Sequence, residues 1–160
     1  MKRWWILSSL LVALAACGPR SKCGPDTAVV DHVIDGDTIV LQDGTKIRYL
    51  LVDTPEITLG KNDCWGQEAA DFNRAHVEGK TVSLKYDDAE CTDRYNRTLA
   101  WVSADGLELN AELVKQGYAC ELYVAPGGQA RKEEFLTYEA QAKTDRVGMW
   151  GQCTVIPCSR

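Results

Sequence analysis

Two aspartate-glycine pairs near the start of the chain restrict what this region can fold into. Asp35-Gly36 and Asp43-Gly44 are each flanked by runs rich in apolar and β-branched residues. A two-residue hairpin turn needs positive φ at both central positions, which aspartate and glycine tolerate, so both pairs are strong hairpin signals. The segment therefore predicts consecutive antiparallel strands, near residues 29–34, 38–41 and 46–52.

The last of these strands ends at a proline. The apolar run from Tyr49 to Val52 indicates a buried strand, and Asp53-Thr54-Pro55 follows it directly. Proline lacks the N–H that a strand ladder needs, and it restricts the residue before it. Further along, the pattern predicts strands near 81–86 and 98–104, and helices near 66–77, 110–116 and 129–146.

The ends of the early strands carry oxygen ligands suited to a hard cation. Asp37 follows the first Asp-Gly pair, whereas Asp53 and the carbonyl of Thr54 follow the buried strand. Calcium accepts such oxygens in irregular geometry and readily keeps bound waters. Glu56 lies just beyond Pro55, where it would reach a metal-bound water rather than the metal. This is the expected position of a general base for hydrolysis.

Two arginines add a phosphate site to these acids. Arg48 lies near the start of the buried strand, and Arg97 ends the turn sequence D-R-Y-N-R that begins at Asp93. Guanidinium forks match phosphate oxygens and remain charged at any workable pH. Taken singly, each arginine could be a surface ion-pair partner, and D-G-D-T could be an ordinary hairpin turn. Together, acids for a metal and arginines for a phosphate predict phosphodiester hydrolysis.

These motifs closely resemble those of the staphylococcal nuclease (thermonuclease) family. The resemblance runs in order, at the family's spacing, from about Val29 to Trp150. It rests on V-I-D-G-D-T, R-x-L-L-V-D-T-P-E, G-x-E-A, D-R-Y-x-R-x-L-A, L-V-x-Q-G-x-A and E-A-Q-A-K. It implies an α+β fold, a five-stranded OB-fold β-barrel with three helices, and a calcium-dependent endonuclease that acts on DNA and RNA and leaves 3′-phosphates.

The resemblance also implies roles for single residues. Asp37, Asp53 and the Thr54 carbonyl would hold calcium, and Glu56 would align the attacking water. Arg48 and Arg97 would bind the scissile phosphate and its transition state. Arg94, Tyr95 and Tyr123 match positions that contact the nucleotide.

The chain departs from the family pattern at two places that bear on nucleic-acid affinity. The loop from Ile57 to Asp63 carries only Lys61, whereas the family often has several lysines there. A second family tyrosine near the nucleotide is replaced by Ala125. We therefore expect weaker binding of mononucleotides and an intact catalytic set.

The N-terminus has the form of an export signal. Lys2-Arg3 precede a mostly apolar stretch that is too short to span a membrane, and Leu14-Ala15-Ala16-Cys17 resembles a bacterial lipobox. We expect lipidation of Cys17; an ordinary secretory signal cut nearby is the alternative. Gly18 is not the aspartate associated with retention in the inner membrane, so the expected address is the outer membrane, facing the periplasm.

Six cysteines remain after Cys17, an even number that indicates three disulfides in an exported chain. Zinc is not expected, since no C-x-x-C occurs. Fifteen pairings are formally possible. Mapped onto the family's fold, Cys120 is expected near the end of the last helix, which favours pairing with Cys153. The remaining pairs would then be Cys64 with Cys91 and Cys23 with Cys158.

The expected organisation is a signal peptide over 1–16, a lipidated N-terminus and linker over 17–28, a nuclease domain over 29–151 and a tail over 152–160. Without Lys2 and Arg3, 16 basic residues face 23 acidic ones, a net charge of −7. This balance argues against tight binding of polynucleotides. The rival interpretations are a non-catalytic OB-fold binding module and a structural or partner-binding envelope lipoprotein. No protein partner is implied, and a monomer is expected.

Overall fold

The fold is taken from a computed structural model, which describes residues 21–87 and 89–158. The predicted signal peptide, the lipidation site Cys17 and the last two residues of the tail lie outside this range. Within the described residues, none of the helices is long and apolar enough to cross a membrane.

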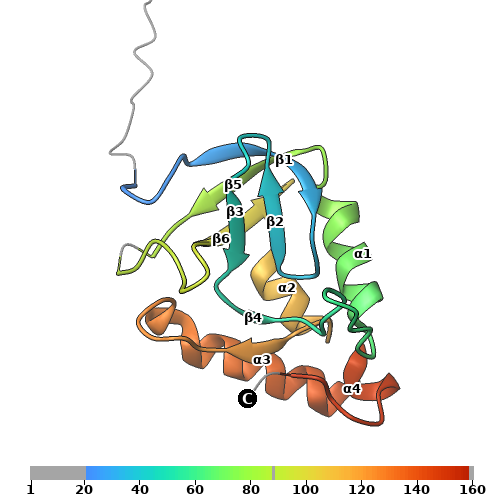
Figure 1. The fold of residues 1–160 in the computed structure, drawn as a ribbon. Helices are drawn as coiled ribbons and strands as arrows, with labels where there is room; N and C mark the ends of the chain where they lie inside the picture. The colour runs from blue at the N-terminus through green and yellow to red at the C-terminus, as the bar shows by residue number, and fades with distance from the viewer. Residues whose placement is uncertain (1–20, 88, 159–160) are drawn as a thin grey trace, which may run out of the picture.

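A closed barrel of five strands forms the body of the domain (Figure 1). Its strands are β1 (Thr27–Val33), β2 (Thr38–Leu41), β3 (Lys46–Tyr49), β5 (Thr81–Lys85) and β6 (Thr98–Ala104). Antiparallel pairing runs in the order β3-β2-β1-β5-β6, and a parallel pairing of β3 with β6 closes the ring. The predicted α+β fold with a five-stranded barrel is confirmed.

The three predicted helices are also present. They are α1 (Gly66–Val77), α2 (Leu109–Lys115) and α3 (Lys132–Asp145). Short elements surround them that the sequence pattern did not predict: β7 (Leu107–Glu108), β8 (Cys120–Leu122), a 3₁₀ turn (Gln129–Arg131) and α4 (Met149–Gln152).

The predicted strand over 46–52 is wrong in one respect, because it is broken after Tyr49. Leu51 has a positive φ of 59°, which a continuous strand cannot contain. The chain turns there, and β4 (Leu51–Asp53) leaves the barrel to pair with β8. The apolar run hides the break, since residues on both sides of it are buried.

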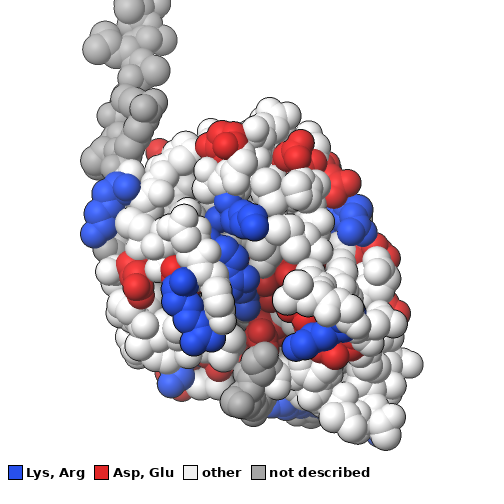
Figure 2. Space-filling model, in the orientation of Figure 1, with Lys and Arg blue, Asp and Glu red and all other residues white. Residues whose placement is uncertain are grey.

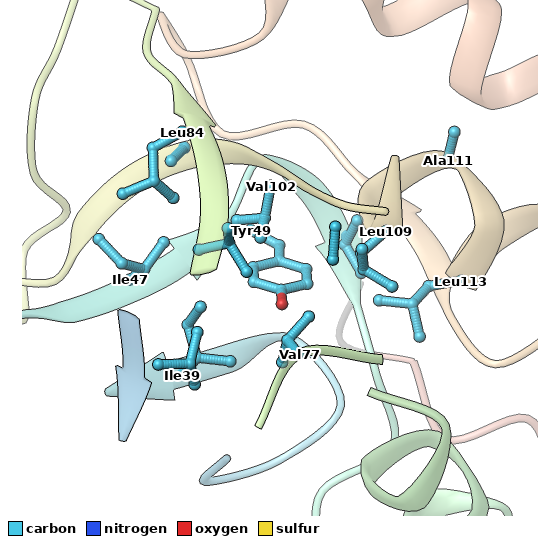
Figure 3. Close-up of a cluster of buried hydrophobic side chains, with 14 of the residues drawn as sticks. Ile39, Ile47, Tyr49, Val77, Leu84, Val102, Leu109, Ala111 and Leu113 are labelled. Carbon is cyan, nitrogen blue, oxygen red and sulfur yellow. The ribbon is translucent and has the colours of Figure 1, made fainter. Parts of the chain in front are cut away.

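The core fills the barrel and continues under α2 (Figure 3). Tyr49 lies near its centre, among Val77, Val102 and Leu109, and is 1% exposed. Its hydroxyl donates to Asn73 Oδ1 at 2.8 Å, so the one polar atom of this ring is satisfied. The ring therefore supports the strand that carries Arg48.

Three disulfides form, as predicted from the six cysteines, but all three predicted pairings are wrong. The pairs are Cys23 with Cys91, Cys64 with Cys153, and Cys120 with Cys158. The N-terminal segment runs beside the end of β5, which brings Cys23 to Cys91. The helical turn α4 brings Cys153 to Cys64, which lies just before α1. The chain after α4 then brings Cys158 to Cys120 in β8.

Candidate active site

Three of the predicted ligand residues are buried together where β2 begins and β4 ends. Asp37 is 4% exposed, Asp53 9% and Thr54 8%. The Asp37 carboxylate accepts hydrogen bonds from the Thr54 amide at 2.8 Å and from the Thr54 hydroxyl at 3.0 Å. These two bonds join the start of β2 to the end of β4, which are remote in the sequence.

Arg48 lies against both carboxylates. Its Nε is 3.1 Å from Asp37 Oδ1, and its Nη2 is 3.6 Å from Asp53 Oδ1. Its Nη1 donates to the carbonyls of Tyr49 and Val52, so the side chain follows the turn between β3 and β4. Figure 2 shows acidic side chains in a hollow near β4, with basic side chains on either side.

The oxygen atoms of this cluster suit a hard cation for which the protein supplies only part of the coordination shell. Two carboxylates and a backbone carbonyl can supply oxygens, and hard cations such as calcium prefer oxygen ligands. Among residues 21–87 and 89–158, no group of three acidic, histidine or cysteine side chains could hold a metal by itself. A cation here would therefore complete its coordination with water or substrate oxygens.

Asp35 supports the turn that presents Asp37. Its Oδ1 accepts the Asp37 amide at 3.0 Å, and its carbonyl accepts from the Asn73 side chain on α1. Burial, followed by the nearby Asp37 carboxylate, raises the pKa of Asp35 to about 7. Asn73 was not predicted from the sequence, because nothing local marks a helix residue that hydrogen-bonds to a distant turn.

Glu56 lies at the start of an exposed loop, with its carboxylate held from within that loop. Thr58 donates to Glu56 Oε1 through its hydroxyl at 2.6 Å and its amide at 2.8 Å. Partial burial opposes ionisation, but these hydrogen bonds prevail and lower the pKa of Glu56. The side chain is thus a carboxylate at neutral pH, which a base requires. Thr58 was also missed from the sequence.

Arg97 is fixed in the turn that ends at β6. Its Nε and Nη2 each lie 2.7 Å from Asp93 Oδ2, and its Nη1 is 3.4 Å from the hydroxyl of Thr38. Partial burial opposes the charge of Asp93, but hydrogen bonds and attraction from Arg97 lower its pKa overall. Since Thr38 also donates to Asp37, Arg97 is one residue removed from the acidic cluster.

The predicted nucleotide-contacting residues divide into two groups. Tyr95 is 65% exposed, and the guanidinium carbons of Arg94 and Arg97 lie 4.8 and 5.5 Å from its ring centroid. Tyr123 instead packs against the core, with Lys132 Nζ 5.0 Å from its ring centroid. The structure thus gathers Arg94 and Tyr95 beside Arg97 and places Tyr123 directly after β8.

The chain is similar to known proteins over most of its length. The family described as staphylococcal nuclease homologue matches residues 46–152. The chain is 37% identical over 129 residues to endonuclease YncB of Bacillus subtilis (strain 168), an alignment that covers 77% of this chain and 61% of YncB. It is 34% identical over 129 residues to the SPbeta prophage-derived endonuclease YokF of the same organism, covering 77% of this chain and 43% of YokF.

An uncharacterized protein of Methanocaldococcus jannaschii, MJ1439, is 35% identical over 147 residues, which covers 76% of this chain and 70% of that protein. The chain thus spans less than two thirds of the length of YncB and of YokF.

Proposed function

The chain belongs to the staphylococcal nuclease family, and from that premise we propose that it is an endonuclease that hydrolyses phosphodiester bonds of DNA and RNA in a calcium-dependent reaction. One observation carries this proposal above the others. The Arg48 side chain, only 11% exposed, lies against two buried carboxylates at one end of the barrel, and Glu56 follows two residues after Thr54 in the chain. Taking these charges out of water costs stability. Clusters of this kind are found preferentially at functional sites, which is why the cluster points to one.

Asp37, Asp53 and the Thr54 carbonyl are the residues that would hold calcium. When bound, the cation supplies positive charge for the phosphoryl oxygens and polarises water. In the protein, Asp37 is already aligned by the Thr54 amide and hydroxyl, so its second oxygen keeps a fixed direction. This order before binding reduces the entropy lost when the site is filled.

The remaining residues handle the proton and the charge of the phosphate. Glu56, kept ionised by Thr58, accepts the proton of the attacking water. Arg48 and Arg97 donate to the phosphoryl oxygens as negative charge develops on them. Cleavage of the P–O5′ bond leaves a 3′-phosphate on one product and a 5′-hydroxyl on the other.

Contacts with the nucleotide beyond the scissile phosphate would be few. Tyr95 offers an exposed ring close to two guanidinium groups, which suits stacking of a base and contact with a phosphate. Arg94 and Tyr123 complete the proposed contacts. The acidic net charge favours rapid release over tight binding, which is compatible with turnover.

The expected processing and domain organisation of the chain complete the proposal. We infer that Cys17 is lipidated and that residues 1–16 are then removed, which leaves a lipidated N-terminus and linker over 17–28, a nuclease domain over 29–151 and a tail over 152–160. The lipid would hold a monomeric enzyme on the outer membrane, facing the periplasm. Three disulfides suit that oxidising compartment.

The test uses the soluble chain that starts after Cys17, incubated with DNA and RNA, with calcium and with chelator. We expect digestion with calcium only. Glu56→Gln should lower kcat by about 10²- to 10⁴-fold with little change in KM. Glu68→Gln, an exposed acid on α1, is the matched control and should retain activity. Binding of nucleic acid without cleavage under any condition would favour the non-catalytic OB-fold module instead.

A further inference from the structure

The loop that carries Glu56 is closed by a reciprocal pair of hydrogen bonds. The Glu56 amide donates to Asp63 Oδ2 at 3.2 Å, and the Asp63 amide donates to the Glu56 carbonyl at 3.0 Å. The residues between them reach the surface, and Leu59 at the tip is fully exposed. Ile57 and Thr58 are half-buried and residues 59–62 are exposed, so the shape of the loop depends largely on how its two ends are held.

The first end of the loop is fixed by the barrel. Thr54 donates to buried Asp37, and Pro55 is itself buried. The second end leads into α1, where the Gly66 amide donates to the Asp63 carbonyl at 3.0 Å, and Cys64, which follows Asp63 immediately, is bonded to Cys153. A covalent bridge therefore lies one residue from the contact that closes the base-bearing loop.

The partner of Cys64 belongs to a firmly packed part of the domain. Cys153 follows α4, and its amide donates to the Met149 carbonyl. Met149 is fully buried, and its amide donates to the Gly117 carbonyl at 2.9 Å. In Figure 1 the segment between β4 and α1 lies beside α4. The bridge thus connects an exposed loop to a rigid support that is remote in the sequence.

We propose that the Cys64–Cys153 disulfide positions Glu56 for catalysis. It fixes Asp63, Asp63 closes the loop, and the closed loop holds Thr58 against the Glu56 carboxylate. This inference rests on the proposed function, in which Glu56 is the base. It adds that the bridge determines where that base lies, beyond any contribution the bridge makes to stability.

The test removes the bridge and asks whether the loss acts through Glu56. The variant carries both Cys64→Ser and Cys153→Ser. Its cleavage of DNA is assayed with calcium at a temperature well below the melting temperature of the variant protein. We expect kcat to fall about 10- to 100-fold, the size expected when a catalytic group is misplaced by about an ångström, with KM nearly unchanged. Thr58→Val, with the bridge intact, should lower kcat in the same way.

Two controls separate positioning from general loss of stability. Leu84→Ala removes a buried core side chain on β5 and should lower the melting temperature comparably while leaving kcat unchanged (Figure 3). In a Glu56→Gln background, removal of the bridge should change the residual kcat by no more than about twofold, because the group it positions is already absent.

The outcomes distinguish the two proposals. If Glu56→Gln leaves cleavage intact, the proposed base is wrong. If Glu56→Gln lowers kcat but the serine pair does not, Glu56 remains the base and the bridge is only structural. The same conclusion follows if bridge removal costs an equal factor in both backgrounds. A fall in kcat confined to the background that retains Glu56 supports the positioning role.

Discussion

Asn110 offers the sharpest test of how the barrel is joined to the segment that bears Asp53. It lies on α2, is fully buried, and makes three hydrogen bonds. Its Oδ1 accepts the Val102 amide at 2.8 Å, and its Nδ2 donates to the carbonyls of Leu50 at 3.0 Å and Ala100 at 3.1 Å. It therefore links α2 and β6 to the turn between β3 and β4.

Replacing Asn110 by alanine removes all three hydrogen bonds, and two of the three backbone groups, the Val102 amide and the Leu50 carbonyl, are left with no replacement for that partner. The Ala100 carbonyl keeps the Leu50 amide as a donor at 3.1 Å. A buried polar group left unpaired costs about 1 to 3 kcal/mol, so the two together should lower the free energy of unfolding by roughly 2 to 6 kcal/mol. The lost side-chain volume adds to this.

The assay is urea unfolding of the oxidised soluble chain, with the midpoint and slope fitted for the wild type and the Asn110→Ala variant. The midpoint should fall while the slope is retained, because both chains expose similar surface when they unfold. Asn62→Ala, at an exposed position, is the control and should shift the free energy of unfolding by less than about 0.5 kcal/mol. A loss below about 1 kcal/mol for Asn110→Ala would refute the reasoning, since that is the net contribution of a single ordinary hydrogen bond.

Three further predictions concern pH, metal and anchoring. Hydrogen bonds from Arg131, then from Tyr138, lower the pKa of Glu134 to about 2. The carboxylate therefore adds stability above its unfolded pKa near 4.5, and this contribution is lost as the pH falls toward 2. The difference in unfolding free energy between wild type and Glu134→Gln should shrink over that range, and a constant difference would contradict the prediction. Calcium should support faster cleavage than magnesium at matched occupancy, because calcium accepts irregular coordination whereas magnesium demands near-ideal octahedral geometry, and equal turnover would argue against it. Cys17→Ser should prevent acylation and leave the precursor uncleaved or release the protein from membranes, whereas wild-type protein without an acyl mass would exclude the lipobox.

The candidate site residues could be singled out in the sequence because their neighbours carry local signals. D-G-D-T and D-T-P-E mark turns within a few residues, although neither Asp35 nor Gly36 has the positive φ of a two-residue hairpin turn. The structure brings Asp37, Asp53 and Arg48 into contact at those turns. The helices were equally accessible, since apolar residues recur at helical spacing within a short window. The resemblance to a family supplied the closed barrel that joins these pieces.

What tertiary structure alone decided are contacts between segments far apart in the chain. The break at Leu51 depends on pairing of β4 with β8, and nothing in an uninterrupted apolar run marks it. The disulfide pairs depend on where the N-terminal segment and the chain after α3 pass over the domain, and spacing along the chain carries no information on that. Sequence patterns report local backbone preference. The contact of Thr58 with Glu56, the hydrogen bond from Asn73 to Asp35 and the bridge from Cys153 to Cys64 depend on how the chain packs.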